Sequence, residues 1–156
     1  TRFKPIRILG HFYMQAGLQL PICLALFPVM AAGTVSPTLF ISAGIIIVVL
    51  ALVCQSIADW QLYAFTQSKD AGGVCRVGFW GISRHPNYFF ECLIWLGIAM
   101  LSVGLPNGLI ALIGPITIRI IVRYITGPYT ETLSLQKRGA AFRAYQQSVP
   151  MIIPRF

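Results

Sequence analysis

The chain has 156 residues, a length that suits a single domain. Hydrophobic residues make up 56% of it and charged residues 10%, whereas ordinary soluble domains carry about 25% charged residues. This composition excludes an ordinary soluble domain and indicates an integral membrane protein. Twelve Lys and Arg against four Asp and Glu give a net charge of +8. Because these basic residues flank apolar stretches, they indicate a bilayer rather than a nucleic acid as their partner.

In chain order, the sequence predicts four membrane-spanning helices and a tail. Apolar stretches with the roughly 17–25 residues that a span needs lie at about 12–33, 38–58, 87–104 and 109–125. They are joined by short turns and one polar loop, at 33–37, 66–84 and 105–108. A basic, amphipathic helical tail follows at 126–156. We therefore expect an all-α polytopic membrane protein with one membrane domain over residues 1–156, and prolines predict a kink in its first span.

The charged residues all fall on one side of this layout. The turns at 33–37 and 105–108 contain no Lys or Arg. All twelve basic residues lie at the N-terminus, in the 59–86 loop, at the end of the fourth span or in the tail, and the four acids share that side. The positive-inside rule makes this side cytoplasmic. We expect both termini and the 59–86 loop to lie there.

The cysteines and the start of the chain carry two further expectations. The four cysteines have no paired spacing, and three lie in or beside apolar runs, so we interpret them as small hydrophobic residues and not as disulfide partners or metal ligands. The chain opens at Thr1 rather than at Met, on a basic stretch without a signal-peptide cleavage pattern. We expect a fragment of a longer protein.

The stretch 78–95 concentrates polar residues in an otherwise apolar chain. Pro86 suits the first turn of a new helix, so the preceding Arg84 and His85 fall at a helix N-terminus, where an anion is favoured. Inside the first turns, Asn87 and Glu91 share one face with Tyr88 beside them. A polar cluster in a membrane helix indicates a site. The alternative is an interfacial anchor made of a basic flank, a proline and an aromatic.

Glu91 weakens the anchor alternative because a carboxylate in an apolar helix costs a few kcal/mol without a partner. Arg119 and Arg123 are the candidate partners, four residues apart on the fourth span. Arg123 has a simpler alternative, in which its side chain reaches the interface. Arg119 lies about 10 Å inside the end of the span, where that reach is harder. We expect it to pair with Glu91 or with a ligand anion.

Two more groups are weaker candidates. Asp59 directly follows the second span. It is either a charge at the helix end or a hydrogen-bond acceptor for a ligand amide or ribose. The tail either lies on anionic headgroups or forms a lid whose arginines hold phosphates; among its polar residues are Glu131, Lys137, Arg138, Arg143 and Tyr145. No Ser-His-Asp triad, P-loop or glycine-rich dinucleotide fingerprint occurs. Any nucleotide must therefore bind between helices.

These segments resemble the C-terminal half of the steroid 5-alpha-reductase-like family, above all its mostly uncharacterised bacterial and lower-eukaryotic branch. The matching segments are Asp59-Trp60-Gln61, Gly78-Phe-Trp-Gly-Ile-Ser-Arg-His-Pro-Asn-Tyr-Phe-Phe-Glu91, and Thr126-Gly127-Pro128 with Glu131, Tyr145 and Pro154. The resemblance implies an α-helical membrane oxidoreductase that uses NADPH to reduce a carbon–carbon double bond in a sterol-like or other lipid. Phe90 stands where the family usually has Gly.

The family's C-terminal half holds the cofactor, so the resemblance implies a cofactor pocket here. Its substrate-side Glu and Tyr come from earlier helices outside this chain, which leaves the catalytic residues of this chain open. With the residues singled out above, the expected cofactor-binding set is Asp59, Arg84, His85, Asn87, Tyr88, Glu91, Arg119, Arg123, Glu131, Arg143 and Tyr145.

Two alternatives stay open. Membrane methyltransferases of the isoprenylcysteine carboxyl type share the Arg-His-Pro-x-Tyr pattern and the later Glu but bind S-adenosylmethionine. A non-catalytic membrane fragment is the other. Asn87 and the Asp59-Trp60-Gln61 context favour the reductase. Several arginines also suit the phosphates of NADPH better than the single carboxylate of S-adenosylmethionine. The expected partners are the bilayer and a hydrophobic small molecule.

Overall fold

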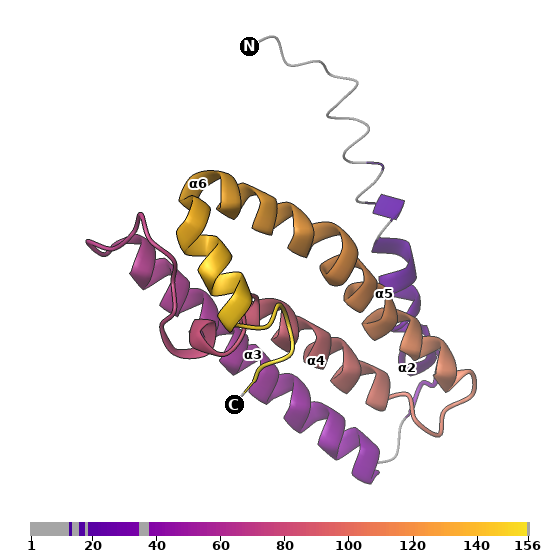
Figure 1. Ribbon diagram of the computed structural model, residues 1–156. Helices are drawn as coiled ribbons and strands as arrows, with labels where there is room; N and C mark the ends of the chain where they lie inside the picture. Colours follow the sequence, from indigo (N-terminus) through magenta and orange to yellow (C-terminus); the bar gives the residue numbers. More distant parts are fainter. Residues whose placement is uncertain (1–12, 14–15, 18, 35–37, 156) are drawn as a thin grey trace.

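The computed structural model describes residues 13, 16–17, 19–34 and 38–155, and within them the secondary structure is entirely helical. The elements pack as a bundle whose longest members run alongside one another (Figure 1). In chain order they are α2 (Phe27–Ala31), α3 (Leu39–Thr66), the 3₁₀ turn η1 (Gly78–Gly81), α4 (Pro86–Met100), the 3₁₀ turn η2 (Gly108–Leu112), α5 (Ile113–Ile121), the π-helical turn η3 (Val122–Thr126) and α6 (Gly127–Ser148).

The longest single α-helix, α3, runs further than predicted. It begins where the Thr38 hydroxyl accepts a hydrogen bond from the backbone N–H of Ile41 at 3.3 Å. It does not end at Ala58 but continues to Thr66, because Asp59 and the residues after it include no Gly or Pro that would stop a helix. Asp59 is therefore a helical residue, not the first residue of a loop.

Helix α4 begins at Pro86, as predicted, with His85 in a non-helical conformation (φ −137°, ψ +65°) before it. It ends at Met100, four residues before the predicted end of the third span. Its 15 residues give a length of about 22 Å, shorter than the roughly 30 Å hydrocarbon core. A turn closed by the hydrogen bond from the N–H of Gly108 to the carbonyl of Leu105 at 2.9 Å follows, which confirms the predicted tight turn.

Helices α3 and α4 approach closely through small residues. A Cβ atom added to Gly97 would lie 2.8 Å from the carbonyl oxygen of Gly44, and one added to Gly44 would lie 2.7 Å from the carbonyl oxygen of Gly97. No larger residue fits at this crossing without moving a backbone. Close approach through small residues is typical of helices in membranes, where van der Waals contact replaces the hydrophobic effect. Further along, Ala51, Ala58, Phe90 and Ile94 form the buried core of the same interface.

One continuous helical stretch of 41 residues, Gly108–Ser148, joins η2, α5, η3 and α6. At 1.5 Å per residue it is about 60 Å long, so only part of it can cross a bilayer. Apart from Arg119 and Arg123, the charged residues of this stretch lie in α6, so the part before α6 is the more apolar one. Helix α6 itself bends at Gly139, whose φ of +53° lies in the left-handed region that favours glycine. The end of α6 therefore turns back over the bundle (Figure 1).

Two helices, Leu39–Thr66 and Gly108–Ser148, are long and apolar enough to cross a membrane. Both leave most of their apolar side chains exposed, as expected of helices in contact with lipid. Part of the first predicted span lies outside the described residues. Within it, residues 19–24 and α2 are helical with a turn at 25–26 between them, so the break predicted from its prolines occurs just before Pro28.

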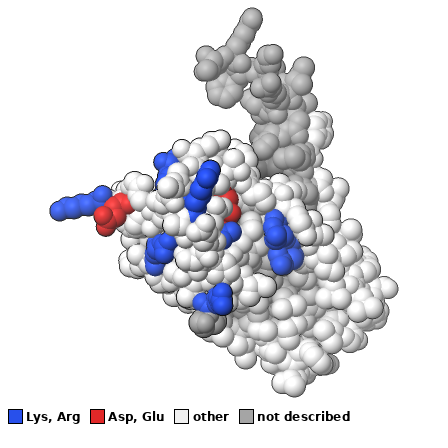
Figure 2. Space-filling model, viewed as in Figure 1, with Lys and Arg blue, Asp and Glu red and all other residues white. Residues whose placement is uncertain are grey.

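The charges gather at one end of the bundle. Figure 2 shows the basic side chains over the part that holds α6 and the loop after α3, whereas the part of that face where α3 begins and α4 ends carries none. The sequence agrees, since residues 38–58 and 92–118 contain no charged residue. The bundle therefore has a charged end and an apolar end.

Candidate functional site

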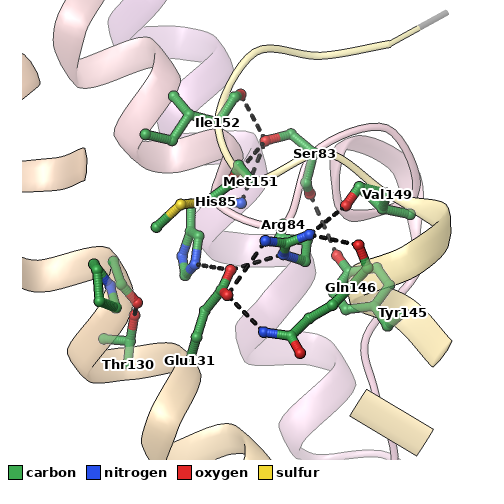
Figure 3. Close-up of polar contacts among 12 residues, drawn as sticks. Ser83, Arg84, His85, Thr130, Glu131, Tyr145, Gln146, Val149, Met151 and Ile152 are labelled. Atoms are coloured by element: carbon green, nitrogen blue, oxygen red, sulfur yellow. Dashed lines mark hydrogen bonds and ion pairs between the residues drawn. The ribbon is translucent and has the colours of Figure 1, made fainter. Parts of the chain in front are cut away.

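A buried carboxylate organises the charged end of the bundle (Figure 3). Glu131 of α6 accepts at Oε1 from Nε of Arg84 at 2.7 Å and pairs there with Nε2 of His85 at 3.2 Å. Its Oε2 accepts from Nη2 of Arg84 at 3.2 Å and from Nε2 of Gln146 at 2.7 Å. The side chains of Arg84 and Glu131 are only 12% and 11% exposed. We call Arg84, His85, Glu131 and Gln146 the Glu131 cluster.

The hydrogen bonds of this cluster outweigh the cost of burial for the carboxylate. Burial alone raises the pKa of Glu131, but the bonds from His85, Arg84 and Gln146, together with the positive charge of Arg84, lower that pKa from 4.5 to about 2. Glu131 is therefore ionised at neutral pH. The bidentate pair with Arg84 is the geometry in which a guanidinium binds a carboxylate most strongly.

The other side of Arg84 binds the end of the chain. Its Nη1 donates to the carbonyls of Gln146 at 2.8 Å and Val149 at 2.6 Å, and its backbone N–H donates to Pro150 at 2.9 Å. Four of the five N–H groups of its guanidinium thus have protein acceptors. The sequence predicted an anion site at Arg84 and His85, and in the structure the Glu131 carboxylate is the anion that they bind. Arg84 also joins the tail to the start of α4.

Two further side chains complete this junction. The buried Tyr145 donates its phenolic O–H to the carbonyl of Trp80 and lies 3.3 Å from that of Ser83. The Ser83 hydroxyl donates to the carbonyl of Ile152 at 2.7 Å. Tyr145 reaches this position because α6 bends at Gly139. The bend therefore folds the tail back onto the segment before α4.

A cavity of about 310 Å³ lies beside the cluster, between the end of α3, the loop after it, the start of α4 and α6. Its volume is at the small end of the range for ligand pockets. The ring of His85 stacks on that of Tyr88 in its wall, with centroids 5.1 Å apart and planes 9° apart. The lining residues are Leu62, Thr66, Val74, Cys75, Trp80, Arg84, His85, Asn87, Tyr88, Thr130, Ser134, Arg138, Phe142 and Tyr145.

One polar wall of the cavity comes from a single face of α6. Thr130, Ser134 and Arg138 follow one another at four-residue intervals, so they form a stripe along the helix. Arg138 donates from Nε to the carbonyl of Gly73, and no acceptor for its Nη1 or Nη2 lies within the described part of the chain. The guanidinium of the exposed Arg76 sits over the ring of Tyr145, 5.1 Å from its centroid. Arg138 thus lines the cavity with unused donors, and Arg76 packs on the ring of Tyr145, which lines the cavity.

The structure brings together part of the predicted residue set. Arg84, His85, Asn87, Tyr88 and Tyr145 line the cavity, and Glu131 lies behind it, bonded to two of them. The other predicted residues do not line it. They are Asp59, exposed on α3; Glu91, which faces α3; Arg119 and Arg123, exposed on α5 and η3; and Arg143, exposed on α6.

The predicted pairing of Glu91 with an arginine is wrong. Its Oε2 accepts from Nε2 of Gln55 at 3.0 Å, and its Oε1 accepts from Nε1 of Trp95 at 2.9 Å. Neither Arg119 nor Arg123 comes within ion-pair distance of it in the described structure. The close crossing of α3 and α4 turns the Glu91 face toward Gln55, so neutral donors satisfy the carboxylate.

Sequence reasoning missed several contributors. Gln146 and Gln55, which bond the two glutamates, are uncharged and occur far from them in the sequence. Thr130 and Ser134 carried a signal that could have found them, because with Arg138 they repeat every four residues. Gln55 is also the one amide side chain among residues 39–58, the apolar part of α3, and such a residue indicates a partner on a neighbouring helix.

Residues 1–149 match the sequence family described as "Protein of unknown function (DUF1295)". The chain belongs to this family. No curated protein and no solved structure matches the chain. The DUF1295 match covers α2 to α6, and so includes the cavity, the Glu131 cluster and the bend at Gly139.

Proposed function

We propose that this DUF1295 chain is the cofactor-binding part of a membrane-embedded, NADPH-dependent reductase of a carbon–carbon double bond in a sterol-like or other lipid. The observation that carries the proposal is the 310 Å³ cavity at the charged end of an apolar helical bundle. A polar cofactor can enter such a cavity from water, and the exposed apolar surfaces of α3 and of the stretch that contains α5 keep the same protein in contact with lipid.

The cavity wall fits a dinucleotide in its chemistry. Arg138 in the wall, and Arg76 over the ring of the lining residue Tyr145, offer guanidinium N–H groups to phosphates. Asn87, Thr130 and Ser134 supply amide and hydroxyl groups for sugar or amide portions. The stacked rings of His85 and Tyr88 offer a flat surface against which a base or nicotinamide can lie. Bound NADPH would supply a hydride, while this chain's residues bind and orient it.

The role of Arg84 changes in this proposal. The sequence placed Arg84 at a predicted anion site, but four of its guanidinium N–H groups bind protein acceptors. We assign it to positioning the cavity wall, through Glu131 and the tail. Arg138 takes the phosphate role.

A second candidate, an S-adenosylmethionine-dependent methyltransferase of the isoprenylcysteine carboxyl type, is favoured by one observation. With Arg84 engaged, Arg138 is the lining arginine whose Nη groups have no acceptor in the described residues. One guanidinium suits the single carboxylate of S-adenosylmethionine, and the modest cavity volume suits one nucleoside. Arg76, on the ring of the lining residue Tyr145, is a second cation near the cavity and favours NADPH.

The finer membrane layout belongs to this proposal as well. Four spans, with the charged end cytoplasmic, are supported by the gathering of charge at one end of the bundle. The helix α4 then spans together with the turn residues that follow it. Cysteines placed at Ser36 and Asn107 should react with an impermeant thiol reagent from the opposite side to one at Ser68. Reaction of all three from one side would exclude the layout.

Ligand titration separates the candidates. The full protein in detergent, with any upstream segment of its reading frame, is titrated with NADPH, NADH and S-adenosylmethionine. We expect NADPH to bind tightest and its affinity to fall as salt rises, because the contacts are ionic. Arg138→Gln should weaken NADPH by about 1.5–3 kcal/mol, the cost of losing hydrogen bonds to a charged group.

Lys137→Gln is the matched control, because Lys137 is an exposed neighbour that does not line the cavity. It should leave the affinity unchanged. Equal losses in both variants would mean general attraction and not a phosphate contact. Preferential binding of S-adenosylmethionine would support the methyltransferase, and binding of none of the three would support a non-catalytic fragment.

A further inference from the structure

A second cavity, of about 430 Å³, is an open groove between α4 and α5. Its surface is apolar, and Arg119 is the one charged residue that contributes to it. The lining residues are Phe89, Cys92, Leu93, Leu96, Leu112, Pro115, Ile116, Arg119 and Ile120. None of them lines the cavity proposed for the cofactor. The groove and the cofactor cavity use different faces of α4. Phe89, Cys92 and Leu96 line the groove, whereas Asn87 and Tyr88 line the cofactor cavity.

The charge on Arg119 has no counterion within the described part of the chain. The chain has four acidic residues, and all four are described. Glu131 is bound to Arg84 and His85, and Glu91 accepts from Gln55 and Trp95. Asp59 and Asp70 are exposed and form no ion pair in the described structure. An exposed guanidinium among apolar helix residues therefore calls for an anion from outside the chain.

We propose that this groove binds one anionic phospholipid, with an acyl chain in the groove and the phosphate at Arg119. The groove needs an apolar occupant and the arginine needs an anion, and an acidic lipid supplies both in one molecule. A covering protein helix would have to present an acid opposite Arg119, and no acidic residue lies within ion-pair distance of Arg119 in the described structure. Because the groove and the cofactor cavity share no residue, this proposal stands whether or not NADPH binds.

Native mass spectrometry of the protein in nonionic detergent tests the proposal. Phosphatidylglycerol and phosphatidylcholine with identical acyl chains are added in equal amounts, and the ratio of the bound lipids is measured. The wild type should retain phosphatidylglycerol in preference. Arg119→Gln should lower that ratio roughly fivefold, the effect expected for one basic residue near a lipid phosphate. Lys137→Gln, an exposed cation on α6 that touches neither cavity, should leave the ratio unchanged.

Filling the groove tests its acyl-chain role separately. Ile116→Trp should reduce the binding of both lipids, because the larger side chain occupies the space of the chain. Thermal unfolding shows whether each variant is folded; Ile116 and Arg119 are exposed, so folding should persist. An unchanged lipid ratio in Arg119→Gln, an equal fall in Lys137→Gln, or a dimer that Ile116→Trp dissociates would overturn the proposal.

Discussion

Two glutamates occupy similar positions in their helices but meet opposite surroundings. Glu91 is the sixth residue of α4 and Glu131 the fifth of α6. Glu131 is held by a guanidinium, an imidazole and an amide, whereas Glu91 is held by an amide and an indole. The glutamate at the charged end of the bundle, Glu131, is therefore the one with charged partners. A carboxylate in the apolar helix pair is satisfied by neutral donors instead.

The two regions also differ in what holds their helices together. Around Glu91, α3 and α4 touch backbone to backbone at Gly44 and Gly97, and apolar contacts continue from there. Around Glu131, the polar bonds of Arg84 and Ser83 fasten the tail to the start of α4. We infer that packing dominates the stability of the apolar end and ionic hydrogen bonding that of the charged end. The predictions below test this difference.

The largest effect is expected when the carboxylate of the Glu131 cluster is removed. Glu131→Gln leaves the Arg84 guanidinium, 12% exposed in its side chain, without its counterion. Breaking a buried ion pair on one side costs about 3–5 kcal/mol, so the free energy of unfolding in mixed micelles should fall by about that much. Glu91→Gln is the matched control.

The control should lose less than about 1 kcal/mol. The buried Oε1 of Gln55 has no hydrogen-bond partner. When glutamine replaces Glu91, a rotation of the Gln55 amide lets Oε1 accept from the new NH₂ group, so one bond is exchanged for another. Similar losses in the two variants would contradict the difference between the regions.

The pH dependence of stability should come from the same carboxylate. The pKa of Glu131 is lowered in the folded chain from 4.5 to about 2, so the unfolded chain takes up this proton first as the pH falls. The stabilisation is then complete above about pH 4.5 and is lost as the pH falls from there toward 2. Unfolding measured from pH 7 to pH 3 should show decreasing stability below about pH 4.5, and Glu131→Gln should flatten that decrease. An equal slope in the variant would assign it to another group.

These differences also mark the limit of what the sequence predicts. The helix start at Pro86 was predictable because proline fixes the local backbone and lacks an N–H. The turn at Leu105–Gly108 was predictable for a similar local reason. The end of α3 was less predictable, because an aspartate such as Asp59 can lie inside a helix as well as at its end.

The partners of the buried charges depend on geometry that the sequence does not contain. The bond from Gln146 to Glu131 requires the bend at Gly139, a residue that sequence reasoning treated as part of one amphipathic tail. The partner of Glu91 depends on how deeply α3 and α4 interlock at their glycines, which sets which helix face Gln55 meets. Charge complementarity alone favoured Arg119 as the partner of Glu91, but Glu91 bonds Gln55 and Trp95.

The smallest expected effect is an absence of energetic coupling between Glu91 and Arg119. It tests the difference between the two glutamates most directly. In a double-mutant cycle, Glu91→Gln and Arg119→Gln should change the free energy of unfolding additively within about 0.5 kcal/mol, as independent sites do. The reason is that Glu91 bonds Gln55 and Trp95 and forms no ion pair with Arg119 in the described structure. The cycle of Glu131→Gln with Arg84→Gln should instead show a coupling of about 1–3 kcal/mol, since each side chain is the other's counterion. A coupling of that size between Glu91 and Arg119 would restore the ion pair expected from the sequence and would remove the unpaired guanidinium on which the lipid groove depends.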